Sequence, residues 1–381
     1  MSSLIERKSP SRNSTSLVLD IGSSSCKAGF SGDAIPRAIV ESVIGYLIPK
    51  VPKSATPDQQ FLGGDAVRAV QDLTLVEFVK DGVIIDWDAA EILWRHILED
   101  KLGVHPEEYA VLITDSAHNP ASKREVMAEI LFEHFNVCAM HVAHQPVLAM
   151  YSYGRTTALV VDCGHVVSQT VPVHEGYVLP HAIERMDLAG LKVTKYLEKH
   201  IQQQAHHLIS QGTHMFDEIK HKCCYVATDF EAEIKLNKQN YLMNYELPDG
   251  HVVSIGKERF EGPELLFGLA NPGSAKQGIQ HLTSKSLKKI PPALRKDMCD
   301  NILLCGGSTM ISGFSQRFNK EVVNTVAPKA VKPKVHAMPQ REHSSWRGGS
   351  ILTSLMTFGP FWVPLEDYKE NGPSIIHRKC Y

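Results

Sequence analysis

The sequence lacks the features that define several large classes of protein. No stretch approaches the roughly 20 consecutive apolar residues that a helix needs to cross a membrane, so we expect no membrane insertion. The formal net charge of −2 provides no field that would attract nucleic acid, and we expect no nucleic-acid partner. The eight cysteines follow no repeated CxxC spacing, which argues for reduced thiols rather than a zinc framework.

Two further absences narrow the expectations. The segment before residue 17 is polar and has no apolar stretch of the signal-peptide kind. We therefore expect a disordered tail over residues 1–16 and a reducing compartment, the cytoplasm or the nucleus. The sequence also has neither a GxxxxGK[ST] phosphate loop nor a GxGxxG that opens a helix, so a nucleotide site has to be argued from other residues.

One phrase occurs twice, an apolar run followed by Asp-x-Gly. The copies lie at 17–27 and 158–168, with Asp20 and Asp162 at equivalent positions. In each copy the β-formers predict a buried strand, and the glycine with small polar residues predicts a tight turn into a returning strand. A single Asp-x-Gly is more often only a capped turn. Two of them can place two carboxylates and two sets of turn N–H groups around one ligand, which indicates a clamp for phosphate and Mg²⁺.

Strands and helices alternate along the rest of the chain. A chain of 381 residues should hold two or three domains, and the alternation favours layered α/β domains over bundles or sandwiches. The Pro- and Lys-rich segment 45–65 predicts an exposed loop. The patterns predict helices at 86–102, 122–135, 144–152, 190–200, 215–226 and 314–326, strands at 109–114 and 137–142, a hairpin at 240–255, a strand ending in a glycine turn at 301–310, and a glycine turn ahead of a helix at 346–352.

Several longer phrases resemble the actin family, and the resemblance covers nearly the whole chain. Ordered matches of this length are specific. The phrases at 85–91 and 303–307 are more similar to the divergent, germ-line-type actin-like proteins than to conventional actin. The family phrases lie at 26–30, 175–177, 179–182, 187–190, 245–250, 348–352 and 372–380.

The resemblance implies an α/β fold with a duplicated, ribonuclease H-like core, in which two lobes and four subdomains surround a nucleotide cleft. Subdomain 1 would comprise residues 17–41, 78–152 and 344–381, and subdomain 2 residues 42–77 with a docking loop at 46–60. Subdomain 3 would comprise residues 153–188 and 276–343, and subdomain 4 residues 189–275.

The same resemblance implies a cofactor, ATP or ADP with Mg²⁺. Asp20 and Asp162 would hold the metal ion through water, and Gln145 would position the attacking water. The pair Gly306–Gly307 would let a flat ligand lie against the backbone, because no Cβ blocks the approach. The phosphates would meet Gly22, Ser23, Lys27 and Gly164, and the nucleoside would meet Gly190, Lys220, Gly306, Gly307, Ser308 and Met310.

Departures from the family pattern gather at this cleft. Val166 adds a branched Cβ where the backbone should approach the terminal phosphate, and His165 removes a carboxylate beside the metal ion. Each such change costs on the order of 1–3 kcal/mol in binding or in the barrier, so we predict weak ATP binding with slow or absent hydrolysis. The other departures are Ile21 and Ser24 in the first turn, Gln169 in place of a histidine, and, on the base side, His221 in place of Glu and Glu342 in place of Lys.

The surfaces used for assembly also depart from the family. The docking loop carries prolines and lysines at 49–54, where conventional actin has an apolar tip, and the apolar plug of the family is diluted at 269–274. Because self-association needs buried apolar contact, we predict poor polymerisation of this protein alone.

One surface matches the family, the apolar cleft between subdomains 1 and 3. Actin-binding proteins insert a helix there, so we expect it to receive cytoskeletal partners. Ordinary packing between the subdomains explains the same residues equally well. The cleft residues are Tyr151, Gly154, Thr156, Tyr177, Leu352, Leu355 and Thr357.

The leading hypothesis is an actin-like cytoskeletal protein, a nucleotide-stabilised interaction scaffold with, by resemblance, a role in germ-cell differentiation. One alternative is an active ATPase or a sugar kinase with the same core. A sugar kinase would need a carboxylate base in a sugar pocket, and no motif supplies one. The other alternative is a conventional filament subunit, which sedimentation of the pure protein would detect.

Overall fold

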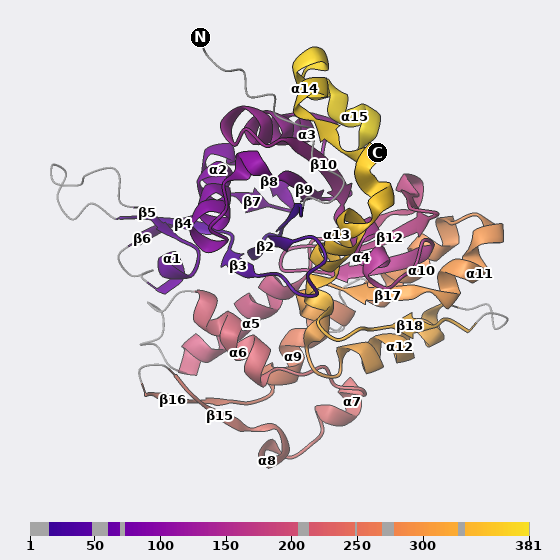
Figure 1. Ribbon diagram of the computed structural model, residues 1–381. Helices are drawn as coiled ribbons and strands as arrows, with labels where there is room; N and C mark the ends of the chain where they lie inside the picture. The colour runs from indigo at the N-terminus through magenta and orange to yellow at the C-terminus, as the bar shows by residue number, and fades with distance from the viewer. Residues whose placement is uncertain are drawn as a thin grey trace, which may run out of the picture.

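The structure, a computed structural model, describes residues 15–47, 60–68, 73–204, 213–247, 250–268, 278–326 and 332–380. Most of the predicted tail, most of the docking loop and the plug at 269–274 lie outside these ranges. Two six-stranded mixed sheets dominate the described part (Figure 1). In the same ranges, no helix has the length and apolar character required to cross a membrane.

The first sheet has the strand order β19-β10-β9-β1-β2-β3. β1 (Leu17–Ile21) and β2 (Ser25–Phe30) form an antiparallel hairpin. β9 (Ala110–Asp115) runs parallel to β1, and β10 (Ala139–His144) runs parallel to β9, so these three strands end at the same edge of the sheet. The outer strands are β3 (Ala38–Glu41) and β19 (Val363–Pro364), both antiparallel to their neighbours.

The second sheet repeats this arrangement. β11 (Ala158–Cys163) and β12 (Ser168–His174) form an antiparallel hairpin, and β17 (Ile302–Cys305) runs parallel to β11. The repeated phrase therefore forms the predicted strand–turn–strand unit in both sheets, and the fold is the two-lobe, duplicated α/β architecture. The remaining strands are β18 (Val335–His336) beside β17, and β13 (Tyr177–Val178) and β14 (Glu184–Met186) beside β12.

Two helices connect the lobes. α4 (Gln145–Ser152) begins directly after β10 and contacts β11, and α13 (Ser344–Ser354) packs against both α4 and β1. A Cβ on Gly348 would lie 1.7 Å from the main-chain oxygen of Leu148 in α4, so only glycine permits this approach. The prediction of a glycine turn at 346–352 is therefore wrong, because these residues lie inside α13 and their glycines serve close helix packing.

The other helices of the two lobes complete the apolar cores. The helices predicted at 86–102 and 122–135 are present, but each ends in a π-helical turn. The first lobe contains α2 (Trp87–Arg95), α3 (Ala121–Glu129), α14 (Leu365–Asn371), α15 (Ile376–Lys379) and the π-turns His96–Lys101 and Ile130–His134. The second contains α10 (Ile279–Lys289), α11 (Pro292–Asp300) and α12 (Phe314–Thr325).

Two smaller parts project from the lobes, at the left and the bottom of Figure 1. The first is a three-stranded sheet of β4 (Val43–Leu47), β5 (Gln60–Leu62) and β6 (Leu73–Glu77) with α1 (Gly64–Arg68). The exposed loop predicted at 45–65 is thus too long at both ends, while residues 48–59 lie outside the described ranges. The second contains α5 (Gly190–Gln204), α6 (Thr213–Cys223), α7 (Phe230–Glu233), α8 (Lys238–Tyr241), α9 (Glu258–Glu264) and a hairpin of β15 (Met243–Glu246) and β16 (Val252–Ile255). The exact subdomain limits stay a prediction.

Candidate functional site

A cavity of about 280 Å³ lies between the turns of the two repeated hairpins. Its lining comes from both lobes, with contributions from α6 and from the segments that follow β17 and precede α13. This volume lies just below the usual range of about 300–1,000 Å³ for small-molecule sites. The predicted site residues that line it are Asp20, Gly22, Ser23, Lys27, Gln145, Asp162, Gly164, Lys220, Gly306, Gly307 and Ser308.

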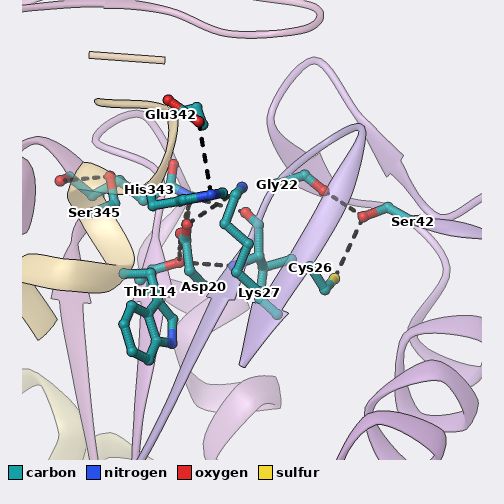
Figure 2. Close-up of polar contacts among 12 residues, drawn as sticks. Asp20, Gly22, Cys26, Lys27, Ser42, Thr114, Glu342, His343 and Ser345 are labelled. Atoms are coloured by element: carbon teal, nitrogen blue, oxygen red, sulfur yellow. Dashed lines mark hydrogen bonds and ion pairs between the residues drawn. The ribbon is translucent and has the colours of Figure 1, made fainter. Parts of the chain in front are cut away.

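Asp20 is fixed at the end of β1 and is 4% exposed. Thr114 Oγ1 donates to Asp20 Oδ1 over 2.8 Å, and Gln145 Nε2 donates to the same oxygen over 3.0 Å. Lys27 Nζ lies 3.7 Å from Asp20 Oδ2 (Figure 2). One carboxylate oxygen is therefore oriented by two neutral donors, while the other forms a long ion pair across the hairpin.

Asp162 occupies the equivalent position at the end of β11. Gln169 Nε2 donates to Asp162 Oδ2 over 3.2 Å. Burial raises the pKa of Asp162, the Gln169 amide partly offsets this, and the negative charge of Asp20 raises the pKa further. A cation between the two carboxylates would relieve this repulsion. Gly306 packs on Asp162 so closely that a Cβ would lie 2.4 Å from Oδ1, and its φ of +87° also requires glycine.

Both hairpin turns are closed in the same way. Gly22 N–H donates to Ser25 O over 3.2 Å, and Gly164 N–H donates to Val167 O over 3.0 Å. An anion between the turns could accept from the N–H groups that remain. In the part of the chain that the structure describes, the turn N–H groups without a protein acceptor include those of Ser23, Ser24, His165, Val166 and Val167.

Lys220 lines the cavity but its charge is already neutralised. The residue is 2% exposed, and its Nζ donates to Asp217 in a short contact and to Thr194 Oγ1 over 3.0 Å. Burial raises the pKa of Asp217, but hydrogen bonds and charge from His221 and Lys220 outweigh it and hold the pKa below its usual range. Sequence reasoning missed Asp217, although its position three residues before Lys220 on a helix was a usable signal.

Two predicted nucleoside contacts lie outside the cavity lining. Gly190 starts α5 behind the wall, where a Cβ would lie 2.5 Å from Ser308 Oγ and 3.3 Å from Lys220 Nζ. Its N–H donates to Gly164 O over 3.1 Å, so Gly190 supports the second turn. Met310 ends the 3₁₀-helix η8 (Gly307–Met310) and is 36% exposed, away from the lining.

The departures from the family pattern that were predicted for the nucleotide cleft all line the cavity. Burial lowers the pKa of His165 to about 4, so this turn carries a neutral imidazole near pH 7. Val166 and Gln169 border the same end, next to Asp162. The remaining departures in the lining are Ile21, Ser24, His221 and Glu342, and sequence reasoning also missed Asp81, Gly82, Arg341 and His343.

Two residues of the 3₁₀-helix η9 (Arg341–His343) indicate that hydrogen-bond partners are missing at the cavity. Glu342 Oε2 and His343 Nδ1 are buried and have no partner among the described residues. Unpaired buried polar atoms cost on the order of 1–3 kcal/mol each, which a bound ligand or water would recover. In the same ranges no three His, Cys, Asp or Glu side chains form a direct metal cluster, but an ion held through water by Asp20 and Asp162 does not require one. The residues present therefore fit a magnesium-bound nucleotide.

The residues of the predicted partner cleft gather where α4, the loop after it and the end of α13 meet. Tyr151 and Leu352 are half-buried against one apolar cluster that includes Trp346 and Phe358. Near them, Met356 is 92% exposed, and sequence reasoning missed it. The exposed members of the predicted set are Gly154, Thr156, Tyr177, Leu355 and Thr357.

Comparisons with known proteins agree with the geometry. The family model described as Actin matches residues 11–381. Actin-like protein 9 of Homo sapiens is 42% identical over 366 residues, which cover 96% of this chain and 88% of that protein. The Bos taurus protein of the same name is also 42% identical, and actin-like protein 7B of Rattus norvegicus is 39% identical over 372 residues, covering 97% of this chain and 89% of that protein. The chain therefore belongs to the actin family, as a divergent actin-related protein.

Proposed function

We propose that this protein is a nucleotide-stabilised scaffold of the cytoskeleton, which binds a nucleotide with Mg²⁺ weakly and hydrolyses it slowly or not at all. One observation carries the proposal: Asp20 and Asp162, at the ends of equivalent strands in the two lobes, line a single cavity. A ligand that contacts both carboxylates through a hydrated cation ties the lobes together. Such a ligand stabilises the folded protein by mass action even when nothing is hydrolysed.

Different residues would contact the metal ion, the phosphates and the nucleoside. Mg²⁺ would supply positive charge between the phosphates and the carboxylates of Asp20 and Asp162. The turn N–H groups, with Ser23, Lys27 and Gly164, would hold the phosphates. Gly306, Gly307, Ser308 and Lys220 would border the nucleoside, for which the family resemblance implies ATP or ADP, while Gly190 and Met310 would support this region from outside the lining.

Weak binding follows from the charges around the cavity. Lys27 is paired with Asp20, and Lys220 is paired with Asp217, so neither ammonium group is uncommitted. His165 is neutral near pH 7. The phosphates would therefore depend mainly on main-chain N–H groups and on the metal ion, and the paired Lys27 would attract them less than an unpaired lysine would.

Slow hydrolysis is expected from the side-chain amides of Gln145 and Gln169. Gln145 Nε2 donates to Asp20 Oδ1 and to Ile21 O, the latter over 2.8 Å, so the amide is tethered to the first hairpin turn. Gln169, in place of a histidine, donates to Asp162 and has no titratable ring. General-base assistance would therefore be reduced.

The test is to identify, by mass spectrometry, any nucleotide released from gently purified protein, and to measure phosphate release alongside conventional actin. We expect substoichiometric nucleotide and a rate far below that of actin, and we expect Asp162→Asn to reduce occupancy further. Phosphate release at the rate of conventional actin would overturn the scaffold proposal in favour of an active ATPase. Long filaments of the pure protein in polymerising salt would favour a conventional filament subunit.

We further propose that cytoskeletal partners dock on the cleft between subdomains 1 and 3. We also propose that the protein acts in the cytoplasm, in germ-cell differentiation. The apolar exposure of Tyr177 and Leu355 supports a helix-in-groove contact. Leu355→Asp should abolish capture of such partners, whereas the same change at a distant exposed residue, Val323→Asp, should leave capture intact.

A further inference from the structure

The cavity lining carries a third carboxylate, that of Glu342, besides those of Asp20 and Asp162. His343 Nε2 lies 3.8 Å from Glu342 Oε1, and Figure 2 shows His343 between Glu342 and the Asp20–Lys27 pair. Glu342 therefore lies beyond His343 as seen from the site that we assign to the metal ion and phosphates. A nucleotide whose phosphates meet the hairpin turns and whose base passes His343 would bring that base to Glu342 (Figure 2).

Within the described residues the only ion-pair neighbour of Glu342 is the His343 ring, and burial lowers the pKa of that ring, which favours its neutral form. The adjacent Arg341 uses its guanidinium elsewhere: Nε donates to Thr309 Oγ1 over 2.9 Å, Nη1 donates to Met338 O over 3.2 Å, and Nη2 donates to Thr309 O. Lys220 is occupied by Asp217 and Thr194. The carboxylate of Glu342 consequently needs hydrogen-bond donors, and one of its oxygens is buried without any.

Open space over Gly307 adjoins the segment that carries this carboxylate. A Cβ on Gly307 would meet nothing within 4 Å, so there is open space over this residue. Gly306 N–H donates to Arg341 O over 3.3 Å, which joins the glycine pair directly to the segment that carries Glu342. A planar base lying over Gly307 would present one edge to the segment that carries Glu342.

We propose that the cleft selects guanine over adenine nucleotides and that Glu342 is the residue that determines this specificity. The N1–H and the 2-amino group of guanine lie side by side, and the two oxygens of a carboxylate accept them as a fork. Adenine presents its 6-amino group beside the N1 lone pair, and that lone pair would face a carboxylate oxygen. The inference rests on the proposed function, since it requires a nucleotide in the cleft, and it replaces the adenine that the family resemblance implies.

The first test is a base series on the full-length protein. Dissociation constants for GTP, ITP and ATP are measured with Mg²⁺ by equilibrium dialysis. ITP differs from GTP only in lacking the 2-amino group. We expect GTP to bind about tenfold or more tighter than ATP, with ITP between them, in line with the discrimination of a bidentate base contact.

The second test changes the carboxylate into its amide. Glu342→Gln offers one acceptor and one donor, which match the 6-amino group and a ring nitrogen of adenine, so the preference should move toward ATP. Glu370→Gln, on an exposed part of α14, is the matched control and should leave the series unchanged. ATP binding as tightly as GTP to the wild-type protein would overturn this inference while leaving the proposed function in place. Absence of binding by all three nucleotides would overturn the proposed function itself, and the base series remains decisive if Glu342→Gln does not fold.

Discussion

Thr114 donates its hydroxyl to Asp20 Oδ1 over 2.8 Å, although the two residues are 94 positions apart in the chain. The same oxygen of Thr114 accepts the main-chain N–H of Ile21 over 3.0 Å, so one buried side chain satisfies both the carboxylate and the backbone at the first hairpin turn. Thr114 is 1% exposed. The end of β9 therefore orients the carboxylate that we assign to the metal ion, before any ligand is present.

Thr114→Val should weaken this arrangement while preserving the volume of the side chain. The change leaves the Ile21 N–H unpaired and removes a donor from a buried carboxylate, which we expect to cost about 1–3 kcal/mol in the free energy of unfolding. We also expect nucleotide affinity in Mg²⁺ to fall about tenfold, because the carboxylate is no longer held in place. Urea denaturation and equilibrium dialysis measure the two effects. Thr74→Val, at an exposed position of β6, is the control, and wild-type behaviour of Thr114→Val in both assays would contradict the assigned role.

The contact between α4 and α13 gives a prediction about folding. A methyl group at Gly348 would lie 1.7 Å from Leu148 O, and main-chain atoms of a packed helix cannot move aside cheaply. We expect Gly348→Ala to cost about 3 kcal/mol or more, or to prevent folding. Gly359→Ala should change stability by no more than about 0.5 kcal/mol, because its Cβ would meet nothing within 4 Å. Thermal unfolding of the two variants makes the comparison, and equal midpoints would show that the helices can separate.

Gly348 also illustrates what the sequence could and could not predict. The repeated Asp-x-Gly phrase predicted both hairpins, because a buried strand and its turn are encoded within about ten residues. A glycine, in contrast, can serve a turn or a close approach between helices, and composition alone does not distinguish the two uses. The sequence therefore predicted a turn where α13 is helical.

The candidate site was likewise predictable where local sequence determines it, and not where contacts between distant elements determine it. Asp20 and Asp162 stood out because they recur, and both line the cavity. Thr114 did not, since its contact with Asp20 depends on β1 pairing with a distant strand. The ion pair between Lys220 and Asp217 could not be predicted from the sequence either, because it depends on burial as well as on helical spacing.

A buried ion pair in the second lobe gives a third prediction. Arg317 Nη2 lies 2.7 Å from Glu264 Oε1, and the side chains of Arg317 and Glu264 are 3% and 0% exposed. Arg317→Met should cost about 3–5 kcal/mol, because Glu264 would be left charged and buried without its partner. The double variant with Glu264→Leu should recover part of this loss. The exposed pair of Arg37 and Asp33 is the control: Arg37→Met should cost no more than about 1 kcal/mol by urea denaturation.

The prediction is tested by comparing the loss of unfolding free energy in Arg317→Met with that in Arg37→Met. If Arg317→Met were no more destabilising than Arg37→Met, the carboxylate of Glu264 would have to be neutral or reached by water in the folded protein. Burial raises the pKa of Glu264, although Arg317 opposes the shift, so removal of the arginine should favour the protonated form at mildly acidic pH. The stability gap between Arg317→Met and the wild-type protein should therefore narrow as the pH is lowered.

Buried histidines predict how stability depends on pH. His141 is 8% exposed, and burial lowers its pKa to about 4, as it does for His144 and His165. Because an unfolded histidine has a pKa of about 6.5, the unfolded chain binds more protons between about pH 6.5 and pH 4. The stabilisation is therefore complete above about pH 6.5 and is lost as the pH falls toward 4.

His141→Asn removes one of these three groups and should flatten the pH dependence. His141 Nδ1 lies 2.9 Å from Phe361 O, so asparagine keeps a donor near this carbonyl. Between pH 7 and pH 4.5 the variant should lose on the order of 2–3 kcal/mol less of its free energy of unfolding than the wild-type protein does. Urea titrations at both pH values measure this difference, and His105→Asn at an exposed position is the matched control. Parallel losses in His141→Asn and the wild-type protein would mean that His141 takes up a proton in the folded state as readily as in the unfolded chain.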